Sequence, residues 1–484
     1  MLILNEVIFR LGAYFEQLKF FLVFSYYIFL FLPLVLFVYF ALNRFHLVEA
    51  AKWFLVFASI VFYSWWDLNN LPILLFSILC NWAIVNAIWR AQKLSDDSAR
   101  RILMLGLLFN IAYLGCFKYY DFLAINANEV FGSELPMLDV VLPLGISFFT
   151  LVQITYLVDA RERLVRGQRF QNYALFVLFF PHLIIGPILH HKDMMPQFEK
   201  LRTKVFVLEN LAAGLVLFGI GFAKKVLIAD PLSPYVALCF DESVSLGMVE
   251  GWQAALAFTC QLYFDFSGYI DMALGSALML NIRMPENFNS PLRSKSIIEF
   301  WSRWHMTLTN FLTTYIYTPI LYRFKKLTFS KSLMAVFATF FISGIWHGAA
   351  WTFILFGTLH GVAVTINHLW RRNHWPMPAF VGWLITFLFV CCSFVVFRAQ
   401  SIADVVKIFS GMIGLNGLSA RNEFSGSSEL SQQFSGMVTY GINLHIVALI
   451  LVAMGIVFLC NNSAALTLKF TKLIGSKNDI KKHS

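Results

Sequence analysis

Long apolar segments separated by short polar loops run along the whole chain. These segments cover residues 20–42, 53–66, 71–89, 102–117, 140–159, 172–190, 206–228, 252–280, 332–370, 378–397 and 443–460. Many of them approach or exceed the roughly 20 apolar residues that an α-helix needs to cross the ~30 Å hydrocarbon core of a bilayer. Backbone polar groups in lipid must be satisfied within their own segment, so the pattern predicts an all-α polytopic membrane protein.

The segment 332–370 contains no Lys, Arg, Asp or Glu, and yet it carries His347 and His360. As one helix it would be roughly 58 Å long, about twice the thickness of the hydrocarbon core, so it must break. Glycines weaken a helix, and two of them place the expected break at 343–348, after only about 16 Å of helix. His347 would then lie near mid-depth, where a titratable ring is a functional candidate. The alternative is a core histidine that donates to a neighbouring helix.

The segment 172–190 contains Pro181 and Pro187 and is flanked by two basic loops. Prolines break a plain span, so we expect this segment to be re-entrant. Basic loops such as 90–101 are expected on the cytoplasmic side, which places the N-terminus outside. The first apolar run, 20–42, is too long for the core of a cleavable signal peptide and should stay as a membrane span.

Composition supports a membrane protein and excludes other classes. The chain has 484 residues, of which 59% are hydrophobic and only 13% charged, far below the ~25% charge of soluble domains. The net charge of +10 is explained by orientation of basic loops in a bilayer, and no nucleic-acid partner is expected. The seven cysteines show no zinc-binding spacing and are interpreted as small buried hydrophobes.

Two acidic residues interrupt the apolar segment 252–280. Asp265 and Asp271 are six residues apart and therefore point to different faces of a helix, so they do not form a paired-carboxylate site. Buried acids are costly in a membrane, and each needs a partner. Asp265 shares a face with Tyr269, and Ser267 shares one with Asp271. These residues are either a structural polar network or part of a functional site.

A polar turn at 287–294 leads into a short helical pattern that ends in Trp304 and His305. The aromatic residues and Arg303 fit an interfacial amphipathic helix. The functional alternative makes His305 the second ring of a site shared with His347. No metalloprotease, serine-elbow, P-loop or dinucleotide motif is found, and no metal site is expected. The residues alone indicate group transfer or transport in a membrane-embedded aqueous cavity, without deciding between them.

Several separated motifs, in order, resemble the membrane-bound O-acyltransferase (MBOAT) family. They are Leu144-Gly145-Ile146-Ser147-Phe148-Phe149, Phe180-Pro181-His182-Leu183-Ile184-Ile185-Gly186-Pro187, Asp265-Phe266-Ser267-Gly268-Tyr269, Phe300-Trp301-Ser302-Arg303-Trp304-His305 and Trp346-His347-Gly348-Ala349-Ala350-Trp351. The chain is most similar to the bacterial branch with the alginate O-acetylation protein and the D-alanine transfer protein of teichoic acid. The likeness covers roughly residues 20–415.

The resemblance implies a ring of about 10–12 transmembrane and re-entrant helices around a central tunnel. It implies His347 as the catalytic histidine and His305 as a second functional one. The donor would be acetyl-CoA, used as a substrate with no bound cofactor. The acetyl group would pass outward to a periplasmic SGNH-hydrolase-like partner acyltransferase, which completes transfer onto a polysaccharide, with the chain in the bacterial inner membrane.

With that resemblance, we expect one integral membrane domain over 1–484. Its parts are an N-terminal extension (1–19), the family-like core (20–415), a loop (416–440), the last span (443–460) and a basic tail (461–484). Substrate-binding candidates are Asp265, Ser267, Tyr269, Asn289, Arg303, Trp304, Trp346 and Trp351. The alternatives are a proton-coupled transporter or flippase of a lipid-linked glycan, although no inverted repeat is found, and an acyltransferase acting on a lipid or protein.

Overall fold

The computed structural model describes residues 27–165, 169–241, 245–418, 438–439 and 442–471, which form helices almost throughout. The first helices are a π-helical turn (Tyr27–Phe31), α2 (Leu32–Arg44), α3 (Val48–Asp67), α4 (Leu71–Ala91), α5 (Asp96–Lys118), α6 (Tyr120–Phe131), α7 (Ile146–Arg161), α8 (Phe170–Leu178), α9 (Phe180–Leu183), α10 (His191–Glu199), α11 (Leu201–Lys204), α12 (Leu208–Lys224), a π-helical turn (Lys225–Ala229) and α13 (Asp230–Asp241).

The second half begins with the longest helix, α14. Its elements are α14 (Met248–Met279), a 3-10 turn (Pro291–Arg293), α15 (Ile297–Trp301), α16 (Met306–Leu312), a π-helical turn (Thr313–Tyr317), α17 (Thr318–Tyr322), α18 (Phe329–His347), α19 (Trp351–Arg372), α20 (Ala379–Arg398), α21 (Ile402–Met412), β1 (Val438–Thr439), β2 (Ile442–Asn443) and α23 (Leu444–Leu459), with a last helix at Ser463–Thr471. The two short strands pair antiparallel, with Val438 opposite Asn443.

Eight helices in the described part of the chain are long and apolar enough to cross a membrane, and a bent pair at the C-terminal end would make nine. This confirms the predicted all-α polytopic membrane protein. Some predicted segments differ from the structure. Helix α3 has 20 residues and is longer than the predicted run 53–66, whereas α14 and the 16-residue α7, which replaces the run 140–159, are not among the candidate spans. Helix α8, with nine residues, ends at a break, so 172–190 is not a plain span, as predicted.

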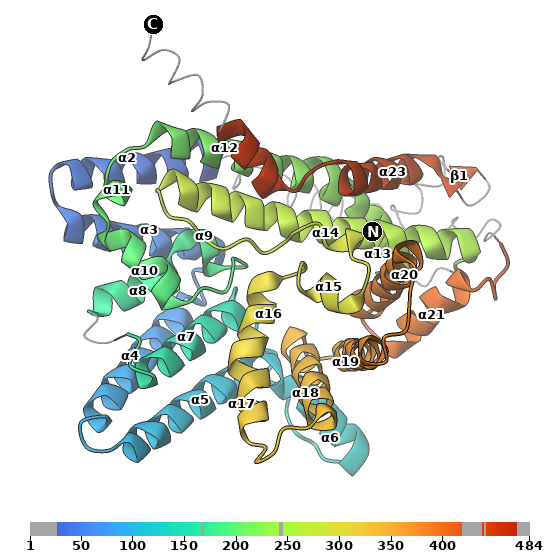
Figure 1. The fold of residues 1–484 in the computed structure, drawn as a ribbon, viewed down its shortest axis with the longest axis horizontal. Coiled ribbons are helices and arrows are strands. Elements are labelled where there is room, and N and C mark those ends of the chain that lie inside the picture. Colours follow the sequence, from blue (N-terminus) through green and yellow to red (C-terminus); the bar gives the residue numbers. More distant parts are fainter. Residues whose placement is uncertain (1–26, 166–168, 242–244, 419–437, 440–441, 472–484) are drawn as a thin grey trace, which may run out of the picture.

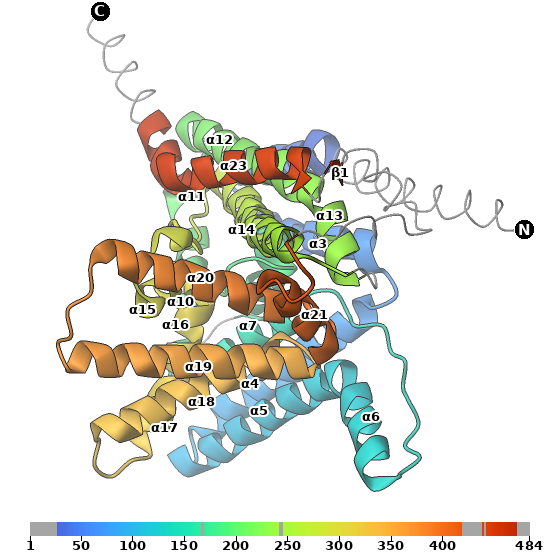
Figure 2. The ribbon, with the colours of Figure 1, turned by 90° about the vertical axis from the view of Figure 1, so that its right-hand side faces the viewer.

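Two groups of helices cross steeply. In Figure 1, α2, α12, α14 and α23 run across the upper part of the molecule and α19 is seen end-on. In Figure 2, α14 is seen end-on, and α19 and α20 run across the view. Between the groups lie the short, irregular elements α15 and α16.

The uncharged stretch 332–370 forms a helical hairpin that breaks at 348–350, at the end of the predicted window 343–348, but the predicted length of helix before the break was wrong. Thr328 caps α18 through the backbone N–H of Lys331, so the helix begins earlier than expected and is roughly 28 Å long when it ends at His347. The break therefore follows a helix of full membrane-spanning length. A side chain on Gly344 would come 2.8 Å from Cα of Gly357, which shows how closely α18 and α19 pack.

Helices α12 and α14 also meet through glycines. A Cβ on Gly221 would lie 2.5 Å from the carbonyl oxygen of Gly268, and one on Gly214 would lie 2.7 Å from that of Gly275. Small residues let helix backbones approach closely in membranes. This contact brings Lys224 at the end of α12, and Lys225 directly after it, against the acidic residues of α14.

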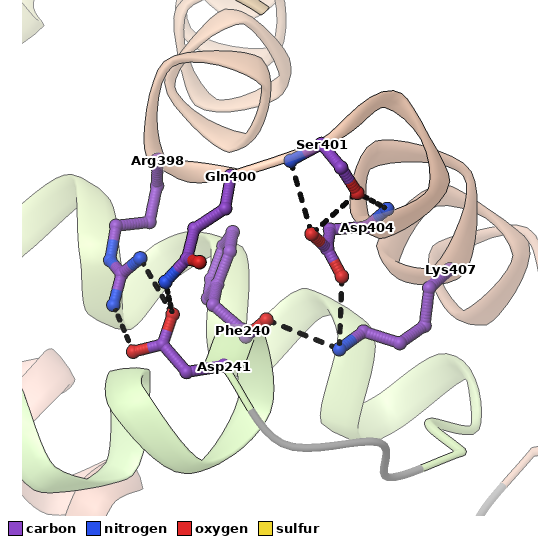
Figure 3. A network of polar contacts seen from close by, with 7 residues as sticks. All are labelled: Phe240, Asp241, Arg398, Gln400, Ser401, Asp404 and Lys407. Atoms are coloured by element: carbon purple, nitrogen blue, oxygen red, sulfur yellow. Dashed lines mark hydrogen bonds and ion pairs between the residues drawn. The ribbon is translucent and has the colours of Figure 1, made fainter. Parts of the chain in front are cut away.

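A polar network joins α13 to the turn between α20 and α21 (Figure 3). Arg398 donates two hydrogen bonds to the Asp241 carboxylate, at 2.9 and 2.6 Å, and Gln400 donates a third. Ser401 forms a capping box with Asp404 at the start of α21. The network fixes the end of α20, which carries part of the wall of the central cavity.

Some predicted parts lie outside the described residues. These are the extension 1–19, most of the loop 416–440 and the tail beyond residue 471. At the beginning of the predicted basic tail, Ser463 donates a 2.6 Å hydrogen bond to Asp271 of α14. Residues 463–471 form a helix that packs on the core.

Candidate functional site

A cavity of about 520 Å³ lies between the two helix groups. Its wall is mostly aromatic and aliphatic, as in sites that bind small molecules. Its polar groups come from Lys118, Ser147, Lys225, Asp265, Tyr269, His305 and His347. The cavity therefore brings together the two histidines that the sequence singled out, although 42 positions separate them in the chain.

His347 is the last residue of α18, and Gly348 fixes where that helix ends. A Cβ on Gly348 would lie 2.1 Å from the ring of Phe353, so only glycine fits there. Lys118 donates hydrogen bonds to the carbonyl oxygens of Trp346 and His347, at 2.5 and 2.9 Å, and so caps the end of the helix. Phe397 packs edge-on against the His347 ring.

The ring of His347 is held by packing rather than by hydrogen bonds. Within the described part of the chain, neither of its ring nitrogens has a hydrogen-bond partner, although the residue lines the cavity. Its nitrogens are therefore available to a molecule that occupies the cavity.

His305 is buried and held in one tautomer by Asn287. The Asn287 side-chain oxygen accepts hydrogen bonds from the backbone N–H of Thr307 at 3.0 Å and from the Thr307 hydroxyl at 2.9 Å. A backbone N–H can only donate, so this atom of Asn287 must be the oxygen and not the amide nitrogen. The same oxygen lies 3.2 Å from Nδ1 of His305. Nδ1 must therefore carry the proton, which leaves Nε2 as a free acceptor.

The surroundings keep His305 neutral. In the sequence it lies outside the candidate spans. Its pKa is lowered to about 3, mainly by burial and to a smaller extent by the nearby His347. Its backbone has a φ of +43°, a left-handed conformation that costs a non-glycine residue about 1–2 kcal/mol. Strain of this kind is concentrated at functional sites. His305 can therefore accept a hydrogen bond at neutral pH.

Asp265 and Asp271 each have a lysine partner, as the cost of burying an acid predicted. Lys225 lies 2.7 Å from Asp265 at the cavity, and Lys224 lies 2.6 Å from Asp271 on the other face of α14. The different faces expected for the two acids are confirmed. The two adjacent lysines were missed, although their place near the end of the apolar run 206–228 was a signal.

The other substrate-binding candidates divide into two sets. Tyr269, Trp304 and Trp346 line the cavity together with Asp265. Four candidates do not line it. Ser267 accepts a hydrogen bond from Lys224, and Asn289 accepts one from Asn462. Arg303 forms an ion pair with Glu299, and Trp351, which is 56% exposed, donates a hydrogen bond to Asn126. The structure therefore gives these four no contact with the cavity.

The functional-site prediction also missed Lys118, Ser147 and Asn287. His360, the second histidine of the uncharged stretch, is a core residue: it accepts from the Trp301 indole N–H at 3.1 Å, and its other ring nitrogen lies 3.1 Å from the Ser393 hydroxyl. Both of its nitrogens are thus used in packing α15, α19 and α20 together. His360 is therefore a structural residue of the core.

Comparison with known proteins places these residues in a family pattern. The sequence model described as "MBOAT, membrane-bound O-acyltransferase family" matches residues 146–403, which include both cavity histidines. The chain is 42% identical to the peptidoglycan O-acetyltransferase of Helicobacter pylori over 81% of this chain and 80% of that protein. It is 37% identical to the probable alginate O-acetylase AlgI of Azotobacter vinelandii, over 80% and 76%. It is 30% identical to the teichoic acid D-alanyltransferase of Bacillus subtilis, over 53% and 69%.

Proposed function

Because this chain belongs to the membrane-bound O-acyltransferase family, we propose that it moves an acetyl group from cytoplasmic acetyl-CoA across the membrane for O-acetylation of an extracellular or cell-wall polysaccharide. The chain is an acyltransferase that crosses the membrane several times, consistent with the bacterial inner membrane. Membership of this family decides for acyl transfer against a transporter or flippase. The observation that carries the proposal is that His305 and His347 line one cavity.

The names of the relatives support the choice of acyl group and acceptor. The two relatives that match about four-fifths of this chain are named for acetylation of peptidoglycan and alginate, both polysaccharides with free hydroxyls. The relative named for D-alanyl transfer is less similar and matches about half of this chain. Acetyl transfer to a glycan is therefore favoured over D-alanyl transfer.

The chemistry follows from the hydrogen bonds of the two rings. A hydroxyl of the acceptor molecule attacks the carbonyl carbon of the acetyl thioester. The new C–O bond forms as the C–S bond breaks. The hydroxyl proton passes through His347 to the thiolate of CoA. His347 is the general base because its ring nitrogens are not engaged by described residues. His305 orients the acceptor hydroxyl through its unprotonated Nε2.

The size of the cavity limits what enters it. A volume of about 520 Å³ suits a small group, so the acetyl thioester would reach the histidines while the charged nucleotide of CoA stays at the cytoplasmic side. The acetyl group would leave on the outer side, where an SGNH-hydrolase-like partner completes the transfer onto the sugar.

Replacement of His347 by Ala tests the proposal. We expect the O-acetyl content of the glycan to fall by about 100-fold or more, the contribution of a general base, with normal amounts of protein in the membrane. His445→Ala is the matched control, because this histidine is exposed on α23 and does not line the cavity. Retained acetylation in the His347 variant would remove His347 from the mechanism.

Inverted membrane vesicles supplied with radiolabelled acetyl-CoA test the donor separately. Transfer of label to an acceptor by the wild-type chain, and not by His347→Ala, supports acetyl-CoA. Acetylation that proceeds without consumption of labelled acetyl-CoA would refute this donor while leaving the role of the histidine intact.

A further inference from the structure

A second hollow lies on the outside of the molecule, between α2 and the segment that leads from α11 into α12. Its volume is about 1070 Å³, twice that of the central cavity, and it shares none of the residues that line that cavity. Several of its apolar residues are more than half exposed, among them Phe37 (74%), Leu201 (81%) and Val205 (62%). The hollow is therefore a groove open to the surroundings of the protein.

The charges on this groove all have one sign. Arg44 and Lys204 line it, with His46 between α2 and α3, and no Asp or Glu from the described residues does so. Neither Arg44 nor Lys204 forms an ion pair with another described residue. The remaining wall is almost entirely apolar, including Leu36, Phe40 and Leu211.

The two bases stand where apolar helices end. Arg44 is the last residue of the candidate span Tyr27–Arg44, and Lys204 lies just before the candidate span Leu208–Asp241. Charged side chains at span ends lie at the boundary between lipid and water, and clusters of bases there attract anionic lipid headgroups. The apolar part of the groove then extends from that boundary into the hydrocarbon region.

We propose that this groove, here called the α2–α12 groove, is a binding site for one anionic phospholipid. The phosphate lies between Arg44 and Lys204, and the acyl chains lie along Leu36, Phe40 and Leu211. This assignment is independent of the proposed acetyl transfer.

The headgroup provides the selectivity. Acyl chains gain little by leaving bulk lipid for a protein groove, because lipid tails are as apolar as the groove. Each base near the membrane surface favours an anionic lipid by about five-fold, so two bases give a preference of roughly 30-fold over a zwitterionic lipid.

Native mass spectrometry of the full chain in mild detergent tests this site. Titration with phosphatidylglycerol and with phosphatidylcholine should give one tightly retained phosphatidylglycerol and a roughly 30-fold weaker phosphatidylcholine adduct. In R44Q/K204Q the preference should disappear. In the matched control K93Q/R100Q, whose bases are exposed in another loop predicted to be cytoplasmic, it should remain. Ala41→Trp, which fills the groove, should lower retention of both lipids.

Equal retention of the two lipids by the wild-type chain would overturn the assignment, as would equal losses in the two double variants. A mass corresponding to two copies, lost in Ala41→Trp, would show that a second copy covers the groove instead. Circular dichroism and size-exclusion chromatography establish that each variant is folded. A variant of Ala41 that fails to fold leaves the charge comparison intact as the deciding measurement.

Discussion

Asn287 determines which nitrogen of His305 is free, and its replacement therefore tests the proposed chemistry directly. Its side-chain oxygen serves three donors, which are Nδ1 of His305 and the N–H and hydroxyl of Thr307. Asn287→Ala leaves these buried donors without a partner. A buried donor without a partner costs about 1–3 kcal/mol, which corresponds to roughly 5- to 150-fold in rate if the loss falls on the reactive geometry of His305.

Asn287→Asp separates positioning from folding. A carboxylate still accepts from Nδ1 and from Thr307, so it keeps the tautomer. Its negative charge also raises the pKa of His305, which is about 3 in the wild-type chain, by about one to three pH units. Activity requires the neutral ring, so it is present above this raised pKa and is lost as the pH falls through it. We expect near-normal activity at pH 8 and a new acid-side loss centred between about pH 4 and 6.

Acetyl transfer by membrane vesicles, measured from pH 4 to 8.5, provides the assay. Asn289→Ala is the matched control, since Asn289 is two residues away and its side-chain oxygen accepts a hydrogen bond from Asn462, outside the cavity. We expect this control to retain activity and the wild-type pH profile. Full activity in Asn287→Ala, or an Asn287→Asp variant reduced equally at every pH, would refute the tautomer argument and reduce Asn287 to a structural residue.

Two further predictions concern the supports of the cavity. Gly348→Ala should cost about 1–3 kcal/mol of stability and most of the activity, because the new methyl group meets the ring of Phe353. Its control is Gly455→Ala inside α23, where open space surrounds the new methyl group, and this variant should lower neither the melting temperature nor the activity. Asp241→Asn should lower the free energy of unfolding by about 1 kcal/mol through its partly exposed pair with Arg398, and leave the pH profile of acetyl transfer unchanged. An unchanged melting temperature in the first or an altered pH profile in the second would contradict these accounts.

The apolar pattern predicted most helices correctly, because a segment in lipid must form the hydrogen bonds of its backbone N–H and C=O groups within the segment itself. The segments 71–89 and 378–397 became α4 and α20 within two residues at each end. The pattern failed where a cap, and not hydrophobicity, set the boundary. Thr328 caps α18, so the helix begins at Phe329, three residues before the uncharged stretch, and a full span rather than half a helix precedes the break.

The motif residues were found from the sequence, but their chemistry was decided by contacts between distant segments. The sequence predicted that the buried carboxylate of Asp265 needs a partner. The close glycine contact between α12 and α14 determined that this partner is Lys225. Arg303 and Trp351, which belong to the same short motifs as the cavity histidines, point to other partners. Residue type and spacing cannot distinguish these cases, because both motifs lie at breaks between helices, where neighbouring side chains face different parts of the molecule. The sequence by itself determined that His305 and His347 are candidate site residues. The tertiary structure decided that they share a cavity and that Asn287 leaves Nε2 of His305 unprotonated. A hydrogen bond depends on where two segments meet in space, and the sequence does not show this.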